Sequence, residues 1–181
     1  MQCAILWPKS CKLLFKLKCH SPAEKTMLRF VFATIAILAC QPASAQYYTR
    51  GHIIDDLVQK ISWLRCSLGQ RWQPDTLTCI GEAQRLNFEE IEQAIAQANT
   101  QLGGSWRLPT KAELQTLVCD TCNGTKIDAE LFPNTAAEPY WTSNKNWVSP
   151  RNRWSISFMT GESYGRFFPE QRLAVRLVAD R

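Results

Sequence analysis

The cysteines limit the folds open to this chain more than any other feature. Four of the eight lie outside residues 1–45, which are interpreted below as a leader. They are Cys66, Cys79, Cys119 and Cys122. An even number of cysteines in an exported chain is typical of disulfides, and four cysteines allow three connectivities. The segment between the first two carries a Pro-Asp turn signal at 74–75, between two strand-like arms, which predicts a hairpin. We therefore favour a bridge from Cys66 to Cys79 that clamps these arms, and with it a bridge from Cys119 to Cys122.

The Cys119-Asp-Thr-Cys122 sequence leaves two other interpretations open, a redox pair and a half-built zinc site. The thiolate of a redox pair is usually stabilised at a helix N-terminus. Here the first cysteine follows the end of a predicted helix, where the dipole disfavours a thiolate. A structural bridge is therefore the favoured interpretation, and a thiol-active envelope enzyme using Cys119 and Cys122 is the alternative.

Residues 1–45 predict a leader and signal peptide. A short basic start at Met27 precedes an apolar run over 30–40, which is too short to span a bilayer comfortably. The small residues Ala-Ser-Ala at 43–45 then form a cleavage site, so we expect the mature protein to begin at Gln46. The predicted location is the periplasm or the cell surface.

Two details of this leader carry alternatives. We interpret Met27 as the true start of translation and residues 1–26 as the product of an upstream start, against a genuine long leader. Cys40 ends an Ile-Leu-Ala-Cys sequence that is similar to a bacterial lipobox. On that alternative the protein is an outer-membrane lipoprotein, and only then do we expect it to contact a membrane.

The distribution of charge argues against nucleic acid as a partner. The formal charge of the whole chain is +5, but residues 1–45 contain six of the basic residues and one of the acidic ones. Residues 46–181 therefore carry 15 basic and 15 acidic residues and have no net charge. A basic protein surface is the electrostatic signature of nucleic-acid binding, and the predicted mature chain lacks that excess.

No motif predicts catalysis, a cofactor or a metal. His20 and His52 are the only histidines, which excludes a site with many histidine ligands. No nucleophile elbow, phosphate loop or dinucleotide glycine pattern is present in the sequence. We therefore expect a protein that is not an enzyme and that needs no cofactor.

The pattern of apolar residues predicts one α+β domain over residues 46–181, with two helices packed on short antiparallel strands. Expected strands are 60–66, 140–143, 153–158, 164–168 and 173–178, after an irregular lead-in over 46–56, and residues 120–139 are expected to be loops. Asn87 and Thr110, with Glu90 and Glu113, form capping boxes that predict helices over 88–102 and from 110 to about 118. The residues expected in a one-sheet core are Trp106, Leu108, Trp141, Trp154, Ile156 and Phe158. Arg107 and Arg176, in apolar surroundings, are expected to pair with carboxylates.

An ordered set of motifs then resembles a known family. The motifs are CSLGQRW (66–72), CIG (79–81), WRLPTKAEL (106–114), FPNT (132–135), YWTS (140–143), WSISFMTG (154–161) and VRLV (175–178). In this order, over about residues 53–178, they resemble the bacterial Lcl C-terminal domain family, which is named for its place at the end of a collagen-like surface adhesin.

The resemblance implies a C-type-lectin-like fold, an exported or surface location and, in the namesake, binding to sulfated polysaccharide. The collagen-like stalk of the namesake is missing here. Calcium-dependent lectins of this fold use a Glu-Pro-Asn loop and a Trp-Asn-Asp strand. Here Glu138-Pro139 is followed by Tyr140, and Trp147 by Val148, so no calcium site is expected. We expect a lectin-like binding module for an acidic polysaccharide or an envelope protein, the other alternative being an accessory subunit of a secretion or pilus apparatus.

The candidate ligand site is the segment 144–153. Residues 82–138 carry a net charge of −5, whereas residues 139–181 carry +4. The site combines three cations with one aromatic ring on an irregular loop that contains a proline. Its residues are Lys145, Trp147, Arg151 and Arg153. Such a set suits an anionic sugar polymer, and the alternative is that Trp147 belongs to the core and the charges are only solvated.

Overall fold

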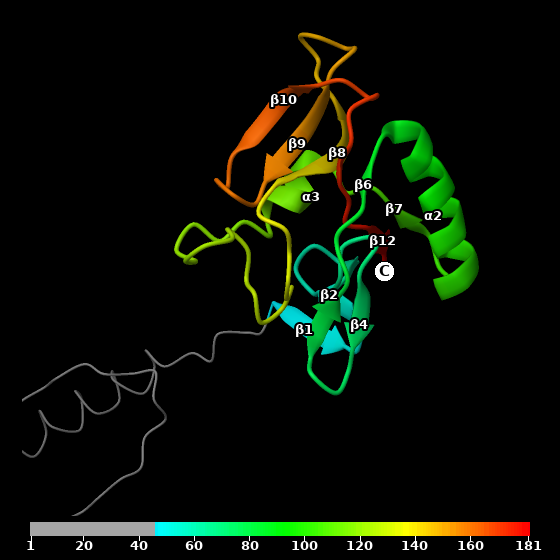
Figure 1. Ribbon diagram of the computed structural model, residues 1–181, viewed down its shortest axis with the longest axis vertical. Helices are drawn as coiled ribbons and strands as arrows, with labels where there is room; N and C mark the ends of the chain where they lie inside the picture. Colours follow the sequence, from blue (N-terminus) through cyan, green and yellow to red (C-terminus); the bar gives the residue numbers. More distant parts are fainter. Residues whose placement is uncertain (1–45) are drawn as a thin grey trace, which may run out of the picture. The chain divides into compact units, whose positions relative to one another are not determined.

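The computed structural model describes residues 46–181, and the account below concerns that part of the chain (Figure 1). The predicted leader, the start at Met27 and the lipobox cysteine Cys40 lie outside the described residues. Among the helices that are described, none has the length and apolar character needed to cross a bilayer.

The predicted α+β class is confirmed, with two helices and short strands. The helices are α2 (Phe88–Leu102) and α3 (Lys111–Gln115). The strands before α3 are β1 (Tyr47–Arg50), β2 (Ile53–Asp56), β3 (Ile61–Leu64), β4 (Arg71–Gln73), β5 (Thr78–Ile80), β6 (Arg85–Leu86) and β7 (Trp106–Arg107). The strands after α3 are β8 (Pro139–Lys145), β9 (Arg153–Ser157), β10 (Ser163–Phe167), β11 (Leu173–Ala174) and β12 (Val178–Asp180).

The first sheet joins the two ends of the described chain. Its strand order is β1-β2-β3-β12-β7, and every neighbouring pair is antiparallel. Strand β12, the last of the chain, lies beside β3 with Val178 opposite Trp63. Both side chains are fully buried, so the pairing of the two ends closes part of the core.

The expectation of an irregular lead-in over 46–56 is wrong, because these residues form the β1–β2 hairpin. The second strand is hard to recognise in the sequence because it ends with two adjacent acids, Asp55 and Asp56. Asp55 is 2% exposed and accepts hydrogen bonds from Ser62 Oγ and Arg50 Nε, both at 2.6 Å. The hydrogen bond from Arg50 holds the pKa of Asp55 below its usual range. A carboxylate with such donors can occupy a buried strand position.

The second sheet has the order β10-β9-β8-β11-β6. Strands β8, β9 and β10 form an antiparallel meander, and β11 pairs parallel to β8 and antiparallel to β6. On one face α2 packs through Phe88, whose ring lies edge-on to Trp141 with 5.0 Å between centroids. On the other face, toward α3, Lys111 Nζ lies 3.8 Å from the centroid of the Trp154 ring. In Figure 1, α3 lies next to β8 and β9, and α2 lies on the side of β6.

The expected single strand over 173–178 is divided between the two sheets, as β11 and β12. Between them the side chain of Arg176 is fully buried, and the backbone bonds to the segment after β3. The Leu68 N–H donates to the Val175 carbonyl at 2.9 Å. The core therefore lies between two sheets, where the sequence pattern had predicted one.

The β4–β5 hairpin and both predicted disulfides are confirmed. In the hairpin, Trp72 is the cross-strand neighbour of Cys79. Cys66 precedes the first arm, so its bond to Cys79 fastens the second arm to the segment that follows β3 and does not link the two arms. The Cα atoms of Cys66 and Cys79 are 5.6 Å apart.

Helix α2 has the predicted bounds. Asn87 Oδ1 accepts a hydrogen bond from the Glu90 N–H at 2.9 Å, and the Glu90 carboxylate accepts one from the Asn87 N–H at 3.0 Å. The helix ends at Gly103, whose φ of 70° is in the left-handed region that glycine adopts without strain. The capping box and the glycine thus fix both ends.

Helix α3 also begins at its predicted capping box, formed by Thr110 and Glu113, but it ends at Gln115. The expected continuation to residue 118 is wrong because Thr116 turns back on the helix. Its hydroxyl donates to the Glu113 carbonyl at 2.7 Å, and its N–H bonds to the same carbonyl at 3.1 Å. The last turn is therefore tightened, and the chain leaves the helix toward Cys119.

Of the six residues expected in the core, five are buried. They are Trp106, Leu108, Trp141, Ile156 and Phe158. Trp154 is only half-buried, between Lys111 and Gly165. It faces the side of the meander where α3 is too short to cover it fully.

Candidate functional site

The segment 144–153, which we call the β8–β9 loop, is a structured projection. Asn146 organises it: Oδ1 accepts from the Val148 N–H at 2.9 Å, and Nδ2 donates to the Gly165 carbonyl of β10 at 2.6 Å. The Asn146 N–H also donates to the Asn152 carbonyl at 2.9 Å. These bonds close the loop on itself and fasten it to the neighbouring strand.

Gly165 allows this close approach. A Cβ at this position would lie 2.8 Å from Asn146 Nδ2 and 2.9 Å from the Trp154 ring. Neither distance is compatible with a side chain, so the contact between β10 and the loop depends on glycine.

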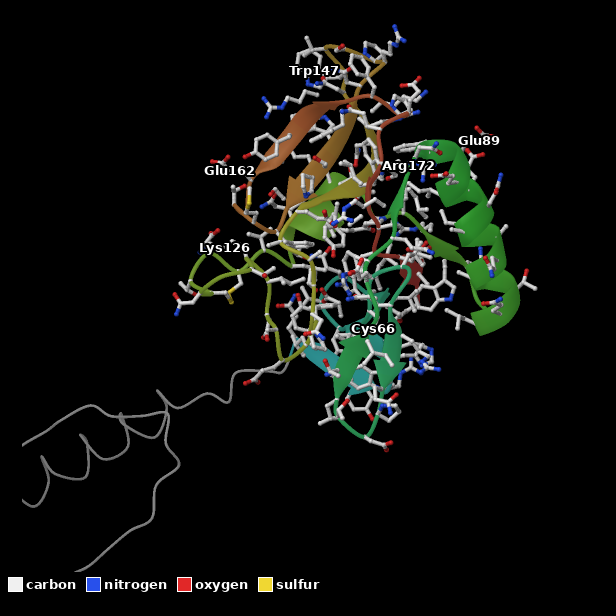
Figure 2. The ribbon with its side chains drawn as sticks, in the orientation of Figure 1. Cys66, Glu89, Lys126, Trp147, Glu162 and Arg172 are labelled. Atoms are coloured by element: carbon white, nitrogen blue, oxygen red, sulfur yellow. A yellow bond between two sulfur atoms is a disulfide. The ribbon has the colours of Figure 1, made fainter. Side chains whose placement is uncertain are left out.

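The tip of the loop exposes two apolar side chains. Trp147 is 85% exposed and Val148 is 70% exposed. Figure 2 shows Trp147 at the outer end of the loop, away from the rest of the described chain. The alternative that Trp147 belongs to the core is therefore wrong.

The structure divides the three predicted cations into two groups. Lys145 and Arg151 are exposed, and the Arg151 guanidinium lies 5.5 Å from the Phe168 ring. Arg153 is half-buried and turns toward α2, with its guanidinium 4.7 Å from the Phe88 ring. Lys145 and Arg153 are direct neighbours across β8 and β9. Arg153 therefore supports the base of the loop, while the other two present their charges to solvent.

The sequence analysis missed a further cation, Arg166. It is exposed on β10, between Gly165, which binds Asn146, and Phe167, which pairs with Arg153. Only the pairing of β10 with β9 brings it to this end of the sheet. The sequence analysis expected a strand over 164–168, but the register of that strand could not be read from the sequence.

None of these cations is neutralised within the described part of the chain. The salt bridges found there involve Arg50, Arg85, Arg107, Arg172 and Arg181. Lys145, Arg151, Arg153 and Arg166 are absent from that set. The end of the second sheet thus combines an exposed indole ring with three exposed cations, Lys145, Arg151 and Arg166, that can contact an anion.

Two other arginines test the expectation of pairing with carboxylates. Arg107 does so, with Glu113 at 2.8 Å and Asp180 at 2.6 Å, and these bonds raise its pKa and lower that of Glu113. For Arg176 the expectation is wrong. Its guanidinium donates to the backbone carbonyls of Leu64 and Arg65, where β3 ends, and to the hydroxyl groups of Ser67 and Thr135.

The Cys119–Cys122 disulfide closes a short loop after α3. The Cys119 N–H donates to the Lys126 carbonyl at 3.2 Å, and Lys126 Nζ donates to the Cys122 carbonyl at 2.9 Å. The loop is thus held by three independent contacts. Within residues 46–181 no group of three or more histidine, cysteine, aspartate or glutamate side chains is placed to hold a metal ion.

Replacing Asn146 with alanine should loosen the β8–β9 loop. The change removes the bonds to the Val148 N–H and the Gly165 carbonyl, each worth about 1 kcal/mol. We expect amide hydrogen exchange at Val148 to become at least roughly ten-fold faster, with exchange in α2 unchanged. Asn152→Ala is the matched control, because the Asn152 Oδ1 has no hydrogen-bond partner in the described part. Equal exchange rates in the two variants would contradict the role given to Asn146.

Comparison with known proteins identifies a family. The model of the Lcl C-terminal domain family matches residues 52–179. Neither the curated proteins nor the solved structures give a significant match to the chain. The matched range includes both helices, the β8–β9 loop, the whole second sheet and the first sheet apart from β1 and the last residue of β12.

Proposed function

Since the chain belongs to the Lcl C-terminal domain family, we propose that it is an exported, C-type-lectin-like binding module that holds an acidic polysaccharide on its β8–β9 loop and catalyses no reaction. One observation carries the proposal. Trp147, 85% exposed, is on the same loop as the exposed Lys145 and Arg151, and Asn146 bonds this loop to Gly165, the neighbour of the exposed Arg166. None of the three cations forms a salt bridge within residues 46–181.

The chemistry of the loop suits such a ligand. A guanidinium forms two parallel hydrogen bonds with a sulfate or carboxylate group, and Lys145 adds a point charge. The flat indole ring of Trp147 offers an apolar surface to the face of a sugar. Because Asn146 already fixes the loop, little conformational entropy is lost on binding. Loops held on a rigid scaffold are common places for binding sites.

Export is part of the same proposal. Two disulfides in a small domain are consistent with an oxidising compartment, such as the periplasm or the cell surface. An acidic polysaccharide is a ligand that a protein meets there.

The double variant Lys145→Gln/Arg151→Gln should bind an acidic polysaccharide about ten-fold more weakly than the native protein. Two exposed charge contacts of up to ~1 kcal/mol each are lost. The measurement is retention on immobilised heparin over a salt gradient, together with the affinity for soluble heparin. Binding of the native protein should weaken as the salt concentration rises, because exposed charges are screened over about 8 Å at physiological ionic strength.

The control is Lys60→Gln/Arg181→Gln, which removes the same charge from the first sheet. Lys60 and Arg181 are both exposed. Arg181 Nε lies 4.0 Å from Asp55 Oδ1, which is a long distance for a salt bridge, so little attraction is lost with it. This variant should elute with the native protein. Equal losses in both variants mean that heparin senses only total charge. A protein ligand is the better interpretation if Trp147→Ala abolishes capture of an envelope protein while heparin never retains the native chain.

A further inference from the structure

A cleft of about 690 Å³ lies between the C-terminal half of α2 and the segment that contains Cys66 and β4. It is distant in the fold from the β8–β9 loop. The loop's Arg153 packs on Phe88 at the first turn of α2, whereas the cleft begins near Ala94 and extends to Leu102. A helix of 15 residues is about 22 Å long, so the two features lie at different ends of α2. Figure 2 shows Trp147 and Cys66 toward opposite ends of the described chain.

Small residues create the space for this cleft. Ala94 and Ala98 are four residues apart and so lie on one face of α2, and both line the cleft. Larger side chains at these positions would fill it. Gln97 and Gln101, also four residues apart, line it as well and are exposed.

The opposite wall is held rigidly. Gly69 has a φ of +89°, and a Cβ there would lie 2.7 Å from the Glu82 carbonyl and 2.6 Å from Gln84 Cγ. The segments around residues 69 and 84 are therefore pressed together, and the Cys66–Cys79 bond fastens the same region. A cleft between a capped helix and a cross-linked wall keeps its shape without a ligand, as most small-molecule sites do.

The lining has a distinctive chemistry. His52 and Arg71 are its ionisable side chains, and it contains no carboxylate. The amides of Gln84, Gln97 and Gln101 make no hydrogen bond with protein atoms in the described residues, so their donors and acceptors are available. Each amide offers two N–H donors and an oxygen acceptor, which complements neighbouring hydroxyl groups.

An aromatic ring completes the lining. Trp72 contributes to the cleft, and the Arg65 guanidinium lies 4.2 Å from its ring centroid, which fixes the position of the indole. The volume is within the usual range of ~300–1,000 Å³ for small-molecule sites. A ring with several free amides, without acidic groups, matches a ligand rich in hydroxyl groups and without positive charge.

We propose that this cleft is a second binding site, which takes an uncharged saccharide and acts independently of the β8–β9 loop. The Gln97 and Gln101 amides hydrogen-bond the hydroxyl groups, and Trp72 supplies the apolar contact. Because the contacts assigned to the ligand come from Gln97, Gln101 and Trp72 and not from the Arg71 of the lining, the affinity is insensitive to salt, unlike that of the loop.

The test uses the purified native protein with isotopically labelled glutamine and tryptophan side chains. Oligomers of glucose and of N-acetylglucosamine are titrated while the side-chain amide signals of Gln97 and Gln101 and the indole signal of Trp72 are followed. We expect one of these oligomers to shift all three signals, with the same affinity at low and high salt. If neither oligomer shifts them, the proposal is overturned.

Three variants sharpen this test. Gln97→Ala/Gln101→Ala should weaken binding by roughly ten-fold or more, because two hydrogen bonds are lost. Ala94→Leu should abolish it by filling the cleft, while leucine keeps the helix stable. Gln93→Ala is the matched control, an exposed glutamine of the same helix outside the lining. An equal loss in the control, or an affinity that falls with salt, contradicts an uncharged ligand in this cleft.

The loop variant separates this inference from the proposed function. Lys145→Gln/Arg151→Gln should keep full affinity for the saccharide, and Gln97→Ala/Gln101→Ala should keep full retention on heparin. Either property can therefore fail without the other. Loss of both in one variant would show that the two features form a single site, against the independence proposed.

Discussion

Replacing Arg176 with methionine should lower the free energy of unfolding by roughly 3–5 kcal/mol. The side chain is fully buried, and its Nη1 donates to the backbone carbonyls of Leu64, at 2.9 Å, and Arg65. Its Nη2 donates to Thr135 Oγ1 at 2.7 Å and to Ser67 Oγ at 3.2 Å. Methionine fills most of the volume but leaves these acceptors buried without donors, at about 1–3 kcal/mol each before relaxation.

The pH dependence of this loss distinguishes the role of Arg176 from that of an ordinary ion pair. Burial lowers the pKa of Arg176 to about 10, so the arginine is charged in both the folded and unfolded states at neutral pH. Its acceptors are carbonyl and hydroxyl oxygens, which do not titrate. The loss in the methionine variant should therefore be the same at neutral and mildly acidic pH. Because the folded pKa of Arg176 is lower than the unfolded one, this group disfavours folding by a constant amount below the folded pKa. That penalty decreases only as the pH rises from the folded pKa toward the unfolded value.

Arg107→Met is the control with the opposite behaviour. Arg107 is one-third exposed and pairs with Glu113, whose pKa it lowers. A carboxyl group with a lowered folded pKa contributes stability above its unfolded pKa, and that contribution disappears as the pH falls through the folded pKa. We expect a loss of about 1 kcal/mol at neutral pH that shrinks in acid. Denaturant unfolding at several pH values measures both variants, and a loss at Arg176 that also shrinks in acid would contradict its assignment.

Arg176 also shows where sequence reasoning reaches its limit. The apolar neighbours at 175–178 correctly indicated burial, and a carboxylate was the natural partner to expect. Two of the actual acceptors are backbone carbonyls more than a hundred residues earlier in the chain, at the point where β3 ends, and the other two are the hydroxyls of Ser67 and Thr135. Backbone groups carry no residue-type signal, so the sequence cannot reveal that kind of partner. The division of 173–178 into β11 and β12 was missed for the same reason, because it depends on backbone pairing with strands distant in sequence.

Structural features that depend on residues close together in sequence were predicted well. The capping box at Asn87 joins residues three apart, and the Pro-Asp turn at 74–75 lies inside its own hairpin, so neighbouring residues alone determine both. Both disulfides followed from spacing and from the turn between the first two cysteines. The strand that contains Asp55 was missed because Arg50 and Ser62 donate hydrogen bonds to this carboxylate only in the folded sheet.

The candidate site was predicted in part, for the same reason. Composition alone placed Trp147 and three cations on one loop, and the ring is exposed there. Composition could not show that Arg153 turns inward to Phe88, nor that Arg166 joins the loop from another strand. The cleft beside α2 gave no signal, because its lining combines Trp72 and Gln97, which are brought together only by packing.

Removing the Cys66–Cys79 disulfide should cost about 3 kcal/mol of stability and lower the melting temperature by roughly 10 °C. The two cysteines are 13 residues apart in sequence, and the bond restricts the unfolded chain by closing that loop. Both sulfur-bearing side chains are buried, so alanine replacements avoid placing a hydroxyl group in the core. Cys119→Ala/Cys122→Ala is the matched control. Its residues are only three apart, so the chain-entropy model predicts a smaller loss of about 2 kcal/mol.

The same pair of variants connects stability with the two binding surfaces. Cys66 lines the cleft, and its bond fastens the wall that faces α2, whereas the β8–β9 loop is fastened separately by Asn146 and Gly165. At a temperature where both variants remain folded, loss of the Cys66 bridge should weaken saccharide binding in the cleft and leave retention on heparin unchanged. Loss of the Cys119 bridge should change neither. Calorimetry and the two binding assays on the same preparations measure this, and an unchanged melting temperature without the Cys66 bridge would show that packing alone holds the wall in place.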